Sequence, residues 1–193
     1  LKEELLELNV LLDDRMSIEL LKRTPSSYLG SCRFKLPDPD TDATPFVKLF
    51  TLFDKYDICA VFYIGGNDSM DTCNKINQYM QSVGYECRVM GVPKTIDNDI
   101  YGTDVTFGFH TAVDIATDVI DRIHTTAGSH SRVMCIEIMG NKAGWLTLYS
   151  GIAGGADIIL LPEIPYDIDK VIEKIEDRDK KGCRFTIIAV AEG

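Results

Sequence analysis

Residues 58–69 join a continuous apolar run to a glycine turn, in the order Ile58-Cys59-Ala60-Val61-Phe62-Tyr63-Ile64 and then Gly65-Gly66-Asn67-Asp68-Ser69. An apolar run without polar alternation predicts a strand buried in a parallel sheet. The glycines let backbone approach an anion closely where the next helix begins. A lone Gly-Gly turn is weak support for a phosphate site, because many strand-to-helix turns use glycine for steric reasons alone. Asp68 also fits an ordinary helix cap.

A second strand-like run, residues 87–92, leads into Pro93-Lys94-Thr95-Ile96-Asp97-Asn98-Asp99. Lys94 can neutralise a phosphate oxygen, and Thr95 can donate a hydrogen bond to one. Asp97 can take the proton of an attacking hydroxyl, and Asp99 can hold a metal or orient Asp97. Taken alone, this loop fits a polar turn. Combined with the glycine turn, it predicts a phosphoryl-transfer site.

Strands and helices alternate along the chain, which predicts parallel sheets joined by crossover helices, with ligands at the carboxyl ends of the strands. We expect all the motifs to lie at those ends. A break at residues 128–131 predicts a second α/β unit, and therefore domains at 1–127 and 128–193. Helices are predicted at 1–14, 17–21, 45–56, 71–83, 104–124, 143–153 and 167–180, and strands at 58–64, 87–92, 133–138, 158–161 and 185–190.

Composition narrows the function classes. The formal net charge of −10 argues against nucleic acid or an anionic membrane as a partner, because both attract basic surfaces. No apolar run approaches the roughly 20 residues of a membrane span. The six cysteines show no metal-ligand spacing, and several lie in apolar runs, which predicts reduced core thiols in a cytoplasmic protein. The three histidines show no zinc spacing either.

These motifs, in this order, resemble the phosphofructokinase family over nearly the whole chain. The resemblance implies the phosphofructokinase fold, an α/β architecture of two Rossmann-like three-layer units with mostly parallel sheets. It also implies a glycolytic, Mg²⁺-dependent enzyme that acts as a homodimer or homotetramer. The matching segments are Gly30-Ser31-x-Arg33, Gly65-Gly66-x-Asp68-Ser69, Thr95-Ile96-Asp97-Asn98-Asp99, Ser129-His130-x-Arg132, Met139-Gly140-x-x-Ala143-Gly144-Trp145-Leu146, Ala153-Gly154-Gly155-Ala156-Asp157, Leu161-Pro162-Glu163 and Ala191-Glu192-Gly193.

The resemblance also assigns roles to individual residues. It makes Asp97 the base for the sugar 1-hydroxyl, with Lys94 and Asp68 as the other catalytic residues. Arg132 would reach the sugar phosphate, in the family often from a neighbouring subunit. The donor phosphates would lie against Gly65, Gly66, Ser69, Arg33 and Thr95. The sugar phosphate would lie against Thr95, Asp97, Asp99, Arg132, Met139, Gly140 and Glu192, and the metal against Asn67 and Asp68.

Two positions bear on the phosphoryl donor. ATP-using members typically carry glycine where this chain has Asp68 and Lys94, whereas pyrophosphate-using members resemble this chain. An aspartate at position 68 would occupy and repel the α-phosphate of a nucleotide, and Lys94 would stabilise a small inorganic donor. The resemblance therefore implies transfer from pyrophosphate to fructose 6-phosphate, giving fructose 1,6-bisphosphate and phosphate.

The chain departs from the family at three places, which keeps alternatives open. Asn67 stands where many members have Asp, and Asn141 stands where they usually have Arg. The strand and Gly-Gly-x-x-Pro-Gly loop that open family members are not found, so we expect a piece from inside a longer enzyme that is inactive alone. A non-catalytic or regulatory subunit and an ATP-dependent enzyme are the alternatives. A kinase acting on NAD or lipid fits the 94–99 and 139–146 segments poorly.

Overall fold

The computed structural model describes residues 15–193 except 26, 29 and 32. It divides into two compact units, residues 1–35 and 36–193. In the first unit, helix α2 (Arg15–Leu21) includes the helix predicted at 17–21 and buries none of its residues. The helix predicted at 1–14 lies outside the described residues. All the elements that follow belong to the second unit.

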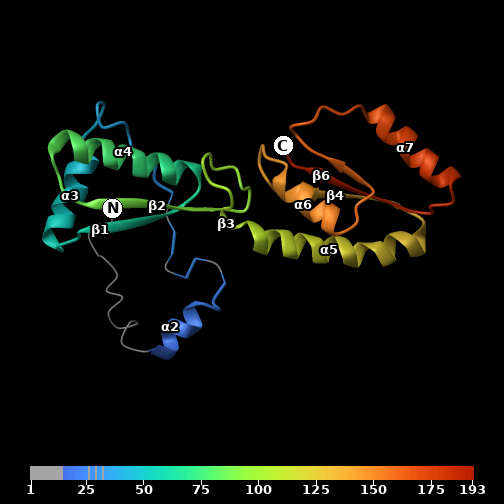
Figure 1. Ribbon diagram of the computed structural model, residues 1–193, viewed down its shortest axis with the longest axis horizontal. Helices are drawn as coiled ribbons and strands as arrows, with labels where there is room; N and C mark the ends of the chain where they lie inside the picture. The colour runs from blue at the N-terminus through green and yellow to red at the C-terminus, as the bar shows by residue number, and fades with distance from the viewer. Residues whose placement is uncertain (1–14, 26, 29, 32) are drawn as a thin grey trace. The chain divides into compact units, whose positions relative to one another are not determined.

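The first sheet of the second unit is parallel and has the order β1-β2-β3. Its strands are β1 (Ala60–Gly65), β2 (Arg88–Thr95) and the two-residue β3 (Phe107–Gly108). Helices α3 (Thr44–Lys55) and α4 (Asn67–Val83) pack with this sheet around a buried cluster (Figure 1). That cluster includes Phe46, Phe50, Ile76, Met80 and Val89.

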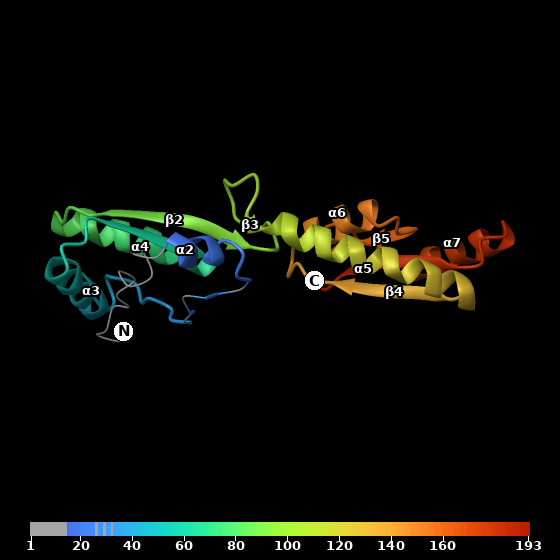
Figure 2. The same ribbon diagram turned by 90° about the horizontal axis from the view of Figure 1, so that it is seen from below.

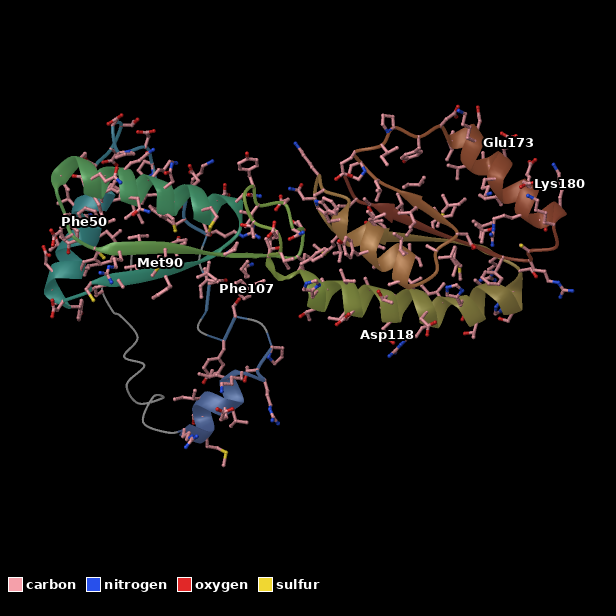
Figure 3. All side chains as sticks on the ribbon, in the orientation of Figure 1. Phe50, Met90, Phe107, Asp118, Glu173 and Lys180 are labelled. Atoms are coloured by element: carbon pink, nitrogen blue, oxygen red, sulfur yellow. The ribbon has the colours of Figure 1, made fainter. Side chains whose placement is uncertain are left out.

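The other face of the first sheet carries exposed apolar side chains. Phe62 and Ile64 on β1 are 62% and 63% exposed, and Met90 on β2 and Phe107 on β3 are also exposed. Figure 3 shows Met90 and Phe107 on the side of the sheet away from α4. The prediction that 58–64 is buried on both faces is therefore wrong. The reason is that α3 and α4 cover one face only, so burial alternates along β1.

The second sheet is also parallel and has the order β4-β6-β5. Its strands are β4 (Val133–Ile138), β5 (Ile158–Leu160) and β6 (Thr186–Ala191). The central strand β6 is buried along nearly its whole length. Helices α5 (Phe109–His130) and α6 (Trp145–Ala153) run along this sheet (Figure 2). Phe109, Ile120 and Leu146 from these helices pack against Ile187 and Ala189 of β6.

Helix α7 (Ile168–Lys180) buries none of its residues and is attached to the second sheet by polar contacts. Figure 1 shows it on the opposite side of this sheet from α5. Arg178 forms an ion pair with Asp157 at 2.7 Å and donates hydrogen bonds to the Thr186 hydroxyl and the Phe185 carbonyl. The alternating elements, parallel pairing and α/β class predicted from the sequence are confirmed.

Most helix and strand bounds differ from the prediction by a few residues, and two of these differences change how the sequence is interpreted. Helix α5 continues through residues 128–130 and is capped by Ser131, whose φ is 50°, so the predicted break is wrong. Ala127 is fully buried, and packing there outweighs the roughly 1 kcal/mol cost of a helical glycine at 128. Strand β2 extends to Thr95, which places Lys94 within the sheet. The domain boundary after residue 127 stays a prediction.

No helix in the described part of the chain is both long and apolar enough to span a bilayer.

Candidate functional site

The two loops singled out in the sequence meet at the carboxyl edge of the first sheet. Strands β1 and β2 are parallel neighbours, with Gly65 opposite Pro93. A Cβ placed on Gly66 would lie 3.7 Å from the carbonyl oxygen of Lys94. The Asn67 side-chain amide donates a hydrogen bond to Asp99 Oδ2 at 2.9 Å. The glycine turn and the 94–99 segment therefore form one continuous surface.

The glycine turn opens helix α4 and is shaped by close packing. Gly66 is the N-cap, with extended backbone, and Asp68 lies in the first helical turn, where a carboxylate favours the positive end of the helix dipole. A Cβ on Gly65 would collide with the Ser69 hydroxyl, so only glycine fits there. Ser69 therefore packs against the turn. The free N–H groups at this helix start can bind an anion.

The segment after β2 is held by a hydrogen-bond clamp between Asn98 and Thr106. Asn98 has a φ of 53°, a left-handed conformation that asparagine tolerates better than most residues. Its Oδ1 accepts from the Thr106 backbone N–H at 2.8 Å, and the Thr106 hydroxyl donates to the Thr95 carbonyl at 2.7 Å. Sequence reasoning missed this clamp, for which the only signal was an asparagine within a polar turn.

Asp97 lies half-buried in this segment, and its surroundings raise the pKa of its carboxyl group. Burial is the largest cause, the charges of Asp99 and Glu192 add to it, and the Thr95 hydroxyl and Lys94 oppose it. Lys94 and Asp97 thus share one electrostatic environment. A carboxylate with a raised pKa is a better proton acceptor than an ordinary one. The arrangement suits a base beside a cation.

Glu192 brings the carboxyl edge of the second sheet into the same environment. It follows β6, and its Oε1 accepts hydrogen bonds from the backbone N–H groups of Gly140 at 3.2 Å and Asn141 at 2.6 Å. Any side chain at Gly193 would collide with the Asn141 carbonyl. Met139, exposed at the end of β4, begins this turn. Glu192 therefore fixes the backbone of 140–141, a role that its sequence context did not indicate.

One predicted site residue of the second unit is not brought to this surface. Arg132 immediately precedes β4, at the strand end opposite Met139 and Gly140, and six strand residues span roughly 20 Å. The expectation that all the motifs lie at carboxyl ends is therefore wrong for Ser129–Arg132, because α5 ends and β4 begins there. It is also wrong for residues 153–157, which lie between the end of α6 and the start of β5. Arg33 belongs to the unit formed by residues 1–35, and its role stays a prediction.

The residues present fit a magnesium ion bound jointly with phosphate. No group of three or more histidine, cysteine or acidic residues in the described part of the chain could hold a metal by itself. Mg²⁺, however, is commonly held by one or two carboxylates together with substrate phosphates and waters. Asp68 at the start of α4 and Asp99, which is hydrogen-bonded to Asn67, supply carboxylates at the edge where phosphates would bind.

Comparisons with known proteins point to one family. The chain matches the Phosphofructokinase family over residues 3–193. It is 54% identical over 174 residues to a protein from Spirochaeta thermophila named ATP-dependent 6-phosphofructokinase, an alignment that covers 86% of this chain and 46% of that protein. A relative of the same name from Chloroflexus aurantiacus is 46% identical, with 90% and 46% covered. The chain therefore spans about half the length of these curated relatives.

Among solved structures, the chain is similar to a structure named pyrophosphate-dependent phosphofructokinase from Marinobacter aquaeolei. The TM-score is 0.85 at 33% identity, and the match covers 100% of this chain and 49% of that one. The names of these relatives thus divide between two phosphoryl donors. The family itself is the same in every comparison, and the chain belongs to the phosphofructokinase family.

Proposed function

We propose that the protein transfers a phosphoryl group to the 1-hydroxyl of fructose 6-phosphate, giving fructose 1,6-bisphosphate. The observation that carries this proposal is the position of Asp97. Its half-buried carboxyl group has a raised pKa and lies within the electrostatic reach of Lys94 and Glu192. A proton acceptor, a cation and a hydroxyl-binding acid are the groups that such a transfer needs at one place.

In this mechanism, Asp97 takes the proton of the 1-hydroxyl as its oxygen attacks the phosphorus of the donor. The bond between that phosphorus and the leaving phosphate oxygen breaks, and Lys94 stabilises the negative charge on the transferred group. The turn at Gly65 and Gly66 holds the donor phosphates against the N–H groups of α4. Magnesium bound at Asp68 or Asp99 would neutralise phosphate charge. Thr95, hydrogen-bonded to the Asp97 backbone at 3.2 Å, orients the base.

We further propose that the donor is pyrophosphate, in a glycolytic enzyme of the cytoplasm. Asp68 stands in the first turn of α4, where a nucleotide would need room for its α-phosphate and where a fixed negative charge repels it. Pyrophosphate has no third phosphate to place there, and Lys94 lies on β2. The relatives named ATP-dependent make ATP the competing donor. The two side chains therefore need a direct test.

The donor test replaces Asp68 and Lys94 by glycine, singly and together, in the longest chain that the gene encodes. A coupled assay with fructose 6-phosphate and magnesium then measures kcat/KM with pyrophosphate and with ATP. We expect the double variant to lose about a hundredfold with pyrophosphate, the effect of removing one charge-stabilising group, and to gain activity with ATP. Unchanged ratios between the two donors would reject the roles of both side chains.

The position of Arg132 favours an assembly of identical chains. Because Arg132 lies at the amino end of β4, it is remote from the turn at residues 139–141 of its own chain, where the sugar phosphate would bind. We propose that it binds the sugar phosphate of a neighbouring copy, in a homodimer or homotetramer. Size-exclusion chromatography with light scattering measures the assembly. Arg132→Ala should raise KM for fructose 6-phosphate and leave kcat unchanged. An active enzyme that is strictly monomeric would rule out a site shared between copies.

A non-catalytic, regulatory subunit is the second candidate. The observation that favours it is the asparagine at position 141, where the family usually has an arginine. The backbone N–H of Asn141 is held by Glu192. The neutral amide provides no positive charge for the transition state. Retained binding of fructose 6-phosphate by calorimetry, together with no turnover from either donor, would select this candidate over the enzyme.

A further inference from the structure

Two cysteines face each other at the amino edge of the first sheet. Cys59 immediately precedes β1 and Cys87 immediately precedes β2, and the paired strands begin with Ala60 opposite Arg88. The Arg88 N–H donates to the Cys59 carbonyl at 3.0 Å, a bond that belongs to the Ala60–Arg88 pair and holds the residues just before both strands side by side. Figure 1 shows β1 and β2 running side by side.

The geometry of a parallel pair places these two residues within disulfide range. Neighbouring strands lie about 4.8 Å apart, and Cα atoms joined by a disulfide lie about 4.4–6.8 Å apart. Side chains two positions apart on a strand share a face, so Cys59 lies on the face of Val61, and Cys87 on the face of Val89. Val61 and Val89 are register partners. Both thiols therefore belong to the same face of the sheet.

The two thiols differ in their exposure to solvent. Both are free. Cys59 is exposed, whereas Cys87 is partly buried and packs against the first core. Burial raises the pKa of the Cys87 thiol, and Cys59 is close enough to raise it further. The predicted core location fits buried Cys73 but is wrong for Cys59, Cys135 and Cys183, which are exposed; Cys32 lies outside the described residues.

We propose that Cys59 and Cys87 form a redox-active dithiol that reacts with small disulfides of the glutathione type. The exposed Cys59 thiolate attacks one sulfur of the small disulfide, which forms a mixed disulfide and releases one small thiolate. Cys87 then loses its proton and attacks the Cys59 sulfur, which breaks the mixed disulfide and releases the second small thiolate. The small disulfide is reduced by two electrons, and the protein dithiol is oxidised by two.

The closed disulfide would join β1 to β2 at the end of the sheet opposite the phosphate-binding turn. Six strand residues separate Cys59 from Gly66, a distance of roughly 20 Å. The bridge would also enclose α4, because the segment 59–87 contains it. A cross-link of that kind stabilises a fold mainly by restricting the unfolded chain. The expected consequence is resistance to unfolding under oxidising conditions.

The test exposes the purified chain to oxidised glutathione at neutral pH and removes the excess. Cys135→Ser/Cys183→Ser serves as the background, because it lacks two exposed thiols that would compete. Intact mass spectrometry should show the loss of two hydrogen atoms with no added glutathione, and peptide mapping should join Cys59 to Cys87. The melting temperature should rise by several degrees and return to its starting value on reduction.

The matched control adds Cys59→Ser or, separately, Cys87→Ser to the same background. Cys59→Ser should abolish both the cross-link and the rise in melting temperature, whereas Cys87→Ser should trap glutathione on Cys59. A stable glutathione adduct on Cys59 in the background protein, a cross-link between chains, or no reaction would each overturn the proposal. Circular dichroism of the reduced proteins verifies that every variant is folded. Cys59→Ser should fold normally because the side chain of Cys59 is exposed.

Discussion

The carboxyl edges of the two sheets use acidic side chains in different ways. At the second sheet, carboxylates hold the backbone. Glu192 accepts from Gly140 and Asn141, and Glu163 accepts from the Gly144 N–H at 2.7 Å. At the first sheet, neutral side-chain amides hold the loop: Asn98 Oδ1 accepts from the Thr106 backbone N–H, and the Asn67 side-chain amide donates to Asp99.

This difference separates acids that serve the fold from acids available for chemistry. Where amides hold the loop, the carboxyl groups of Asp68 and Asp97 remain at the surface that a donor would approach. Glu192 has both kinds of effect. It holds the backbone at the carboxyl edge of the second sheet, and it also raises the pKa of Asp97 at the carboxyl edge of the first sheet. The composition of a motif does not reveal which task an acid has. Substitutions at matched positions can.

The largest expected effect is that of Asp97→Asn, which keeps the shape of the side chain and removes the base. We expect kcat to fall by about 10²- to 10⁴-fold, the usual contribution of a positioned general base. The assay is the coupled phosphoryl-transfer reaction, run with both donors in the longest chain that the gene encodes. Activity within a fewfold of the unsubstituted enzyme would show that Asp97 is not the base.

Asp97→Asn should lower activity but raise the stability of the fold at neutral pH. The pKa of Asp97 is raised in the folded state, so the folded protein binds more protons than the unfolded protein as pH rises from the ordinary carboxyl pKa to the folded one. Stability is lost across that window and stays lower above it. Asp97→Asn should therefore raise the free energy of unfolding at neutral pH, by less than about 1 kcal/mol because the group is partly solvated. Below pH 3 the gain should vanish, which urea denaturation at several pH values measures.

A pair of glycines distinguishes space kept for a ligand from space filled by packing. A Cβ at Gly66 would make only an ordinary 3.7 Å contact with the Lys94 carbonyl, so the expected cost of Gly66→Ala is limited to the roughly 0.5–1 kcal/mol by which alanine is a poorer N-cap than glycine. A Cβ at Gly154 would lie 2.7 Å from Ile120, which is fully buried. Gly154→Ala should therefore destabilise the fold by about 1–3 kcal/mol.

Gly66→Ala should instead weaken the binding of the phosphoryl donor, because its methyl group stands where a phosphate approaches the helix start. We expect about a tenfold loss, equivalent to ~1.4 kcal/mol, in the affinity for pyrophosphate measured by calorimetry. Thermal denaturation of both variants completes the comparison. If Gly66→Ala destabilised the fold as much as Gly154→Ala, then glycine 66 would be there for packing.

The sequence predicted the first edge better than the second, for physical reasons. Apolar runs identify strands, and parallel neighbours bring their ends together, so the meeting of Gly66 with Lys94 followed from local pattern. The contacts of Glu192 with Gly140 and Asn141 join residues about fifty positions apart, and no local pattern encodes them. The clamp between Asn98 and Thr106 likewise depends on tertiary placement. The exposed face of β1 was not predicted, because an apolar run does not reveal whether helices cover one face of the sheet or both.

The smallest expected effect isolates the electrostatic link between the two edges. Glu192→Gln keeps an oxygen that can accept from Gly140 and Asn141 but removes the charge that raises the pKa of Asp97. The pKa of Asp97 should therefore fall only part of the way toward its ordinary value, since burial remains the largest cause. Carboxyl NMR of Asp97 across a pH titration measures this without needing turnover.

Glu163→Gln is the matched control, because Glu163 also holds a backbone N–H yet is not among the groups that raise the pKa of Asp97. Both variants weaken a charge-assisted hydrogen bond, so both should lose about 1 kcal/mol of stability. Only Glu192→Gln should move the titration of Asp97. Equal shifts in the two variants would mean that loosening the second edge, and not the charge of Glu192, controls the base.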